Sequence, residues 1–225
     1  MGKETVCGSL INWESGKFVP VVAGRTYYGG HQRWLLDEGV SKFYSDRSCG
    51  VTAITNMLIY MAQNRPDKAR LIGINQNHVT DKNHNLVNKQ CIKKSDYSAL
   101  QKSVYNRILP AIWGVPTVNT LTSRVQKFAL ERGVSLKVVK YTKVWTEANV
   151  KAFIATGLNK NCPVLLLTWN SVITDLKLHW VTVTHLYGTE TGTKMVTSNW
   201  GNMQTYDFTA WVNGSSFYRG VVYFE

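Results

Sequence analysis

One stretch, residues 45–61, constrains the fold most strongly, because it joins a short polar turn directly to a helix that is apolar almost all round. Its aliphatic side chains recur at the spacing of one helix face, at Val51, Ile54, Leu58 and Met61. Apolar residues on the remaining faces are typical of a helix in the middle of a domain. The sequence therefore predicts a buried central helix over residues 46–64.

A cysteine, Cys49, lies where this helix is expected to begin. Asp46 and Ser48 are both residue types that favour the N-cap, so we expect the first turn to start within two residues of the cysteine. Unpaired N–H groups and the helix dipole favour an anion at that end, which makes a thiol easier to ionise. Because the thiolate is the reactive form, we predict that Cys49 is a catalytic nucleophile.

The two parts of the chain after residue 45 have different sequence patterns. Helical spacing dominates residues 46–133, whereas residues 134–225 carry the runs that are typical of strands. Residues 1–45 are interpreted as an N-terminal extension or strand layer, with an edge strand at Phe18–Val22 because Pro20 interrupts it. A chain of 225 residues with this order predicts one α+β domain, in which the central helix packs on a C-terminal antiparallel sheet.

The same periodicities predict the remaining elements. Helices are expected over residues 97–108, from a cap at Thr120 or Thr122 to Gly133, and over residues 146–157. Strands are expected over residues 135–141, 163–169, 179–187, 194–198 and 217–224, with a hairpin turn from Gly188 to Gly192. The polar, asparagine-rich residues 71–95 are interpreted as a long surface loop.

The charge balance is strongly basic, with 26 Lys and Arg against 14 Asp and Glu, a net charge of +12. Such a charge favours an anionic partner surface or simply solubility. The basic residues are scattered, so no nucleic-acid-binding motif is predicted. No apolar run of about 18 residues is present, so we expect no membrane span. No signal peptide is visible, which leaves the compartment open; a secreted protein is favoured over a cytoplasmic one.

The cysteines and histidines do not show the spacing of a metal site. The four cysteines are Cys7, Cys49, Cys91 and Cys162. They form no C-x-x-C pair, so neither a structural zinc nor a disulfide framework is predicted. Three histidines in turns and loops are given no metal role: His31, His78 and His84. We expect neither a metal nor a cofactor.

A base and an orienting group follow later in the chain. His179 begins a predicted strand, and Asn199 ends the next one, so a hairpin would bring both to the end away from its turn, nearly opposite one another. An asparagine there can accept from one imidazole N–H and leave the other nitrogen for a thiol. Asp207 and Asp175 are alternative orienting groups, Asp207 being the stronger of the two. His185, close to the turn, should be remote from Cys49.

The order Cys49, His179, Asn199, with Trp200 and Gly201 after the asparagine, resembles that of papain-like cysteine peptidases. In that family the histidine and asparagine follow the cysteine by about 130–150 residues. The separations here are 130 (179 minus 49) and 150 (199 minus 49). The run from Cys49 to Ala53 (CGVTA) is more similar to the branch that contains bacteriocin leader peptidases. The resemblance extends from about residue 43 to residue 225 in element order, and its specific part is about a dozen residues.

The resemblance implies a papain-like fold, with Cys49 as nucleophile, His179 as base and acid, and Asn199 as the orienting group. It also implies that Trp200 shields the bond between His179 and Asn199 from water. The sequence departs from the family at position 43, where the family has a glutamine that binds the oxyanion and this chain has Phe43.

Two upstream residues are the candidates to replace that glutamine. Gln32 is the only glutamine before the cysteine, 17 residues upstream. Asp46 is close enough in sequence to lie near the oxyanion hole, although its charge would oppose an oxyanion. Both are kept as possible oxyanion or orienting groups.

These residues predict a bacterial cysteine peptidase that hydrolyses protein or peptide substrates. Two alternatives stay open. The same fold and residues also serve acyltransferases, deamidases and cell-wall amidases. A non-catalytic, basic, aromatic-rich binding module with an inert Cys49 is the other alternative, because an isolated cysteine in an apolar helix usually serves packing.

Overall fold

The computed structural model describes residues 4–73, 91–214 and 216–225. The predicted surface loop over residues 71–95 falls mostly on residues 74–90, and so do His78 and His84; that prediction lies outside the described residues. Residues 71 and 72, at the start of the predicted loop, belong to a 3-10 helix, η2 (Pro66–Ile72). A short strand and a helix follow directly after Cys91.

The chain contains both helices and strands, and most of the strands form one large antiparallel sheet. This confirms the predicted α+β class. The helices are α1 (Lys42–Ser45), α2 (Cys49–Asn64), α3 (Lys94–Ile108), α4 (Val118–Leu130), α5 (Glu147–Asn159) and α6 (Phe208–Gly214). Two further 3-10 helices are η1 (Gln32–Leu36) and η4 (Thr174–Leu176).

The large sheet has the strand order β5-β10-β6-β7-β8-β9, and β1 pairs with β7. Its strands are β1 (Thr5–Ser9), β5 (Val138–Lys140), β6 (Val164–Asn170), β7 (His179–Thr189), β8 (Gly192–Asn199), β9 (Asn202–Asp207) and β10 (Ser216–Phe224). All of these pairings are antiparallel. Because β7 is 11 residues long, its first half pairs with β6 and its second half with β1 along the same edge.

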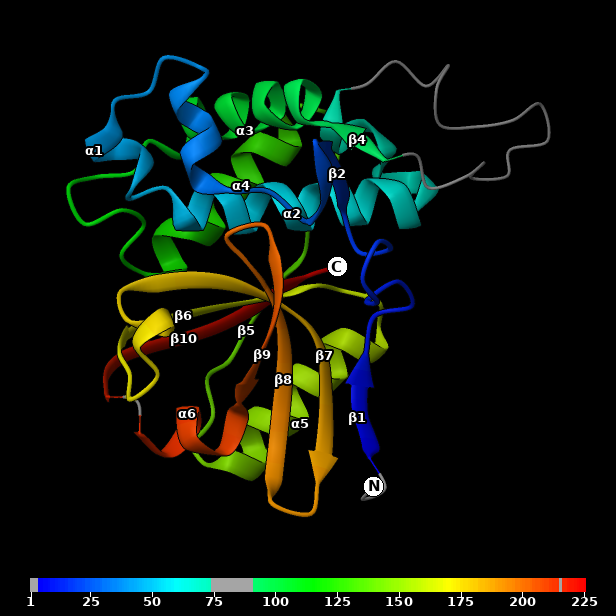
Figure 1. Ribbon diagram of the computed structural model, residues 1–225, viewed down its shortest axis with the longest axis vertical. Helices are drawn as coiled ribbons and strands as arrows, with labels where there is room; N and C mark the ends of the chain where they lie inside the picture. Colours follow the sequence, from blue (N-terminus) through cyan, green and yellow to red (C-terminus); the bar gives the residue numbers. More distant parts are fainter. Residues whose placement is uncertain (1–3, 74–90, 215) are drawn as a thin grey trace.

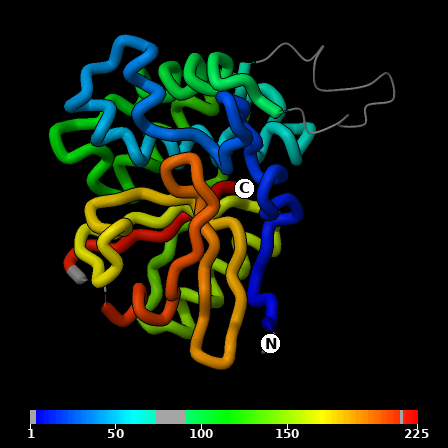
Figure 2. Tube along the Cα trace, viewed as in Figure 1, coloured from blue at the N-terminus to red at the C-terminus, as the bar shows by residue number. Residues whose placement is uncertain are grey.

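The helices divide between the two faces of this sheet (Figure 1). Helices α1 to α4 form one layer, and α2 packs from that layer against β6 and β7. Helix α5 lies on the other side, against β1, β6 and β7. The first residues of the chain run from β1 along the side of the sheet up to the helical layer, as the blue end of the trace in Figure 2 shows. The predicted central helix is therefore the element that joins the helical layer to the sheet.

A second, smaller sheet corrects one prediction. It has the order β3-β2-β4, with β2 (Pro20–Ala23), β3 (Arg25–Tyr28) and β4 (Ile92–Lys93). The predicted edge strand at residues 18–22 is thus β2, which is the central strand. Proline is tolerated there because β4 pairs only with Val21 and Val22, so the missing N–H of Pro20 is not needed on that side.

Several predicted boundaries also differ from the structure. The cap of α4 is Thr117, whose hydroxyl accepts from the N–H of Thr120 at 3.1 Å, and not Thr120 or Thr122. The strand expected over residues 135–141 is only β5, three residues long. The hairpin turn is shorter than predicted, because β7 extends to Thr189 and β8 already begins at Gly192. Among the described residues, none of the helices has the length and apolar character needed to cross a membrane.

Gly8 permits the close contact between β1 and α5, and this leads to a stability prediction. A Cβ on Gly8 would lie 2.6 Å from the Cα of Ala155, which is backbone and does not move aside easily. We expect Gly8→Ala to lower the free energy of unfolding by about 1–3 kcal/mol. Gly188→Ala is the matched control, since its Cβ would meet the Thr5 carbonyl at an ordinary 3.7 Å. Urea unfolding of both variants tests this; equal stability would contradict it.

Candidate active site

Cys49 is the first residue of α2 and is 9% exposed. Ser48 occupies the N-cap position, but its hydroxyl donates to the carbonyl of Tyr44 at 2.7 Å. Asp46, the other predicted cap residue, is the C-cap of α1. The N–H groups of the first turn of α2 are therefore directed at the region around the cysteine without a side-chain cap from Ser48, which favours a negative charge there.

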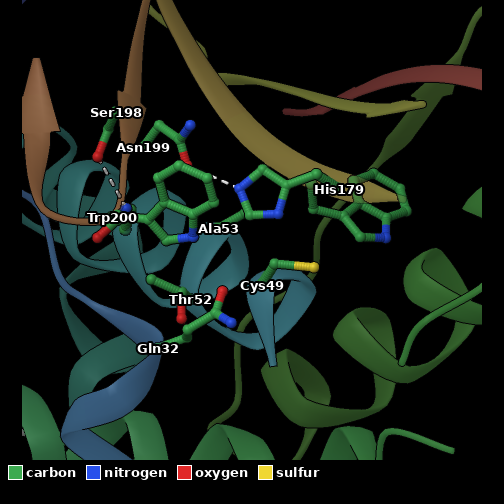
Figure 3. A pocket seen from close by; sticks show the side chains of 10 residues that line it. Gln32, Cys49, Thr52, Ala53, His179, Ser198, Asn199 and Trp200 are labelled. Carbon is green, nitrogen blue, oxygen red and sulfur yellow. Dashed lines mark hydrogen bonds between the residues drawn. The ribbon is translucent and has the colours of Figure 1, made fainter. Parts of the chain in front are cut away.

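His179 and Asn199 lie beside one another at the ends of neighbouring strands. The Nε2 atom of His179 is 2.7 Å from the Oδ1 atom of Asn199, and this bond is buried (Figure 3). The strand register places Thr182 opposite Ser198, so the pair predicted to lie nearly opposite one another is diagonal, two residues out of register. A diagonal pair is within reach of a histidine ring. Because Nε2 is used in this bond, Nδ1 is the ring nitrogen that remains for the thiol.

The thiol and the imidazole perturb each other strongly. Burial on its own would raise the pKa of the Cys49 thiol, but the hydrogen bond and charge of His179, with the backbone N–H groups of Trp180 and Gly50, lower it. Burial would lower the pKa of His179, and the contacts with Cys49, Asn199 and Asp175 raise it. Both shifts favour the thiolate–imidazolium form of the pair.

The Trp200 ring packs against the His179 ring, beside its bond to Asn199. Its ring centroid is 4.9 Å from that of His179, with the planes tilted by 44°, and Figure 3 shows it beside the bond between His179 and Asn199. Trp200 follows β8 directly, in a tight turn where its own φ is +48° and that of Gly201 is +73°. The location matches the shielding position that the sequence resemblance implies.

Gln32 also lines the pocket, despite the 17 residues that separate it from the cysteine. The chain folds back here: the hydroxyl of Ser45 donates to the Gln32 carbonyl at 3.0 Å, and the Gln32 Nε2 donates to the Asp46 carbonyl at 2.8 Å. An amide nitrogen has two hydrogens, so one N–H remains for another acceptor. The Oε1 atom is buried and has no partner among the described residues. Figure 3 shows this amide directed toward Cys49.

Asp46 and Asp207, two acidic residues predicted as possible orienting or oxyanion groups, do not line the pocket. The carboxylate of Asp46 binds Arg33 at 3.1 Å and Lys42 at 2.7 Å, and its hydrogen bond to Lys42 lowers its pKa most. It is therefore engaged away from the pocket. Asp207, expected to be the stronger alternative to Asn199, pairs with Lys194 and caps α6 through the Ala210 N–H. It lies at the far end of β9 and does not orient His179.

Sequence reasoning missed one residue that contacts the predicted triad. The Nδ2 atom of Asn199 donates to the hydroxyl of Tyr206 at 3.0 Å. That hydroxyl lies 3.4 Å from Asp175 Oδ2 and also bonds to Gln204 Oε1. Asp175, the weaker alternative in the sequence, thus belongs to the site indirectly. No strand is predicted from the sequence over residues 202–207, so only the structure shows that Tyr206 shares a face of β9 with Gln204.

The rest of the pocket is small and is lined by both polar and apolar side chains. It encloses about 210 Å³, including its open mouth, and Thr52, Asn56 and Ser198 form its inner wall. Asn56 is held there by the Gly30 N–H at 3.0 Å and by Ser198 Oγ at 3.1 Å. Since part of this space is open solvent, the pocket has little enclosed room, and it fits one carbonyl group of a longer substrate better than a buried ligand.

The described residues contain no group of three or more His, Cys, Asp or Glu side chains placed to hold a metal ion. No model of a known protein family matches the chain, and a search of curated proteins finds no match either. The geometry of the pocket therefore has to carry the functional conclusion on its own.

Proposed function

We propose that this protein is a cysteine peptidase of papain-like fold that hydrolyses peptide bonds in proteins or peptides. The observation that carries the proposal is the convergence of Cys49, His179 and Asn199 around one pocket, with the 2.7 Å bond between His179 and Asn199. The order of elements supports the fold: a helix that begins at the cysteine packs on an antiparallel sheet that carries the other two residues.

The chemistry follows from this arrangement. The Cys49 thiolate attacks the peptide carbonyl carbon, forming a C–S bond while the carbonyl electrons move to the oxygen. His179, as imidazolium, donates its proton to the departing amine, which leaves a thioester on Cys49. His179 then takes a proton from water as the water oxygen attacks the thioester carbon. The C–S bond breaks, which releases the carboxylic acid and restores the thiolate–imidazolium pair. Asn199 holds the imidazole in the required orientation throughout.

The tetrahedral oxyanion needs donors, and we assign this role to the Cys49 N–H and the free N–H of Gln32. Removing one such donor typically lowers kcat by about 10²–10³-fold. We therefore expect Gln32→Ala to lower kcat by that factor with little change in KM. Gln126→Ala is the matched control, since Gln126 also donates to a carbonyl, that of Leu136, but does not line the pocket. Equal kcat values for the two variants would contradict the assignment.

The test of the function itself is a peptide mixture derived from a whole proteome, incubated with the protein and analysed by mass spectrometry. New peptide ends that depend on Cys49 support a peptidase. Products in which an acyl group has moved to an amine would indicate a transferase. Conversion of side-chain amides to acids without new ends would indicate a deamidase. Absence of any product with both this mixture and cell-wall fragments would favour a binding module.

A further inference from the structure

The Asn199 amide is hydrogen bonded at both of its ends, and the second bond leads outward to Tyr206 and Asp175. We propose that Tyr206 and Asp175 form an outer relay: Tyr206 fixes the orientation of the Asn199 amide, and Asp175 supplies the negative charge that favours protonated His179. This inference rests on the proposed function, because it assigns positioning residues to the same site. Tyr206 acts through Asn199 and Asp175 acts through its charge, and neither residue lines the pocket.

The direction of each hydrogen bond can be worked out from the outside inward. A carboxylate oxygen and an amide oxygen can only accept, so the single hydroxyl hydrogen of Tyr206 lies on the side of these two neighbours. It is shared between Gln204 Oε1, which is the nearer, and Asp175 Oδ2 at 3.4 Å. The Tyr206 oxygen must then accept from Asn199, which places the Nδ2 group on that side. Oδ1 is left facing His179, where it accepts from Nε2–H. This tautomer leaves Nδ1 for Cys49.

Without Tyr206, neutral His179 could pair with either orientation of the asparagine amide, since its Nε2 atom can accept as well as donate. An amide turned by 180° would place a donor against the protonated Nε2, which is repulsive. Burial raises the pKa of Tyr206 to about 12, so its hydroxyl keeps its proton at neutral pH. The relay therefore stays intact over the range in which His179 titrates.

Asp175 provides a negative charge near His179. It lies in η4, four residues before His179. Cys49 from α2 and Asn199 from β8 act on His179 by hydrogen bonds, and the Trp200 ring packs against it. Asp175 from η4 acts by its charge and has the smallest of these effects on the imidazole. Asp175 is therefore the carboxylate that favours the imidazolium, in addition to the thiolate itself. Because Asp175 is exposed, its effect should weaken in high salt.

The test uses the full-length chain and two readouts. The first is the pH profile of kcat/KM, whose alkaline limb reports loss of the imidazolium. The second is the titration of the His179 ring by NMR in the Cys49→Ala background, which needs no substrate and no activity. We expect Asp175→Asn to shift both to lower pH, because the charge that favours the imidazolium is removed. Asp175→Glu should restore them, and 1 M NaCl should reduce the difference.

Tyr206→Phe, which keeps the ring, should lower kcat by about 10-fold and shift the same titration to lower pH. Two control variants lie at the other end of the hairpin: Tyr187→Phe and Glu190→Gln remove the same groups there. The relay is wrong if Tyr206→Phe and Asp175→Asn move the His179 titration no further than these controls. If the protein proves to be no peptidase, the NMR titration still decides the relay separately.

Discussion

Replacing Cys49 by alanine is expected to lower the hydrolysis of the peptide mixture by about 10⁴-fold or more, which is the scale seen when a covalent nucleophile is removed. Alanine has no nucleophile, and the thioester cannot form. The fold should persist, because the change is small and Cys49 is one of many buried side chains of α2. Circular dichroism and thermal unfolding check this independently of activity.

Cys162→Ala is the matched control for this variant. Cys162 is also buried, but burial raises the pKa of its thiol, and Arg65 and not a histidine contacts its sulfur, at 2.9 Å. We expect this variant to retain the hydrolysis rate of the parent protein. Hydrolysis that survives in Cys49→Ala, or that is lost only in Cys162→Ala, would remove Cys49 from the mechanism.

The second large effect is expected for His179→Ala. Without its base and acid the protein should lose about 10³–10⁴-fold in kcat/KM. The thiol should also become unreactive at low pH. Burial raises the pKa of the Cys49 thiol, and the contacts that lower it come mainly from His179. Removing His179 therefore leaves the effect of burial largely unopposed, and the pKa of the thiol should rise. At pH 6 a thiol of ordinary pKa, about 8.5, is only roughly 0.3% ionised.

Iodoacetamide labelling near pH 6 measures this change, in a background where Cys7 and Cys91 are replaced by serine. We expect the labelling rate of Cys49 to fall by about 100-fold in His179→Ala, to the level of an ordinary thiol or below. His185→Ala is the control, because His185 is a buried histidine of the same strand that stacks on Trp13, with ring centroids 3.9 Å apart. A similar fall in both variants would mean that the effect is structural.

Periodicity and spacing were sufficient for the parts of the fold that are local. The central helix is visible because its apolar residues recur every three or four positions, and the hairpin that carries His179 and Asn199 is visible because its strands are adjacent in sequence. The register was less predictable, since an irregularity between Val183 and His185 shifts the pairing by one residue. His179 and Asn199, predicted to lie nearly opposite one another, form a diagonal pair across the two strands.

Contacts between distant segments could not be predicted in this way. Gln32 enters the pocket only because two hydrogen bonds fold residues 32–46 back on themselves. Tyr206 reaches Asn199 across a turn, with no spacing rule that would identify it. The central position of β2 depends on its pairing with β4, more than 60 residues later, which periodicity does not report. Such contacts depend on tertiary packing, which one sequence does not reveal.

The most direct test of the central claim is the pKa of the Cys49 thiol, read from the ultraviolet absorbance of the thiolate as the difference between the parent protein and Cys49→Ala. The structure predicts that the midpoint of this titration lies below that of an ordinary cysteine, which is about 8.5. A midpoint at or above about 8.5 would contradict it. Cys49 would then be one more buried side chain of α2, and the proposed peptidase would have no nucleophile.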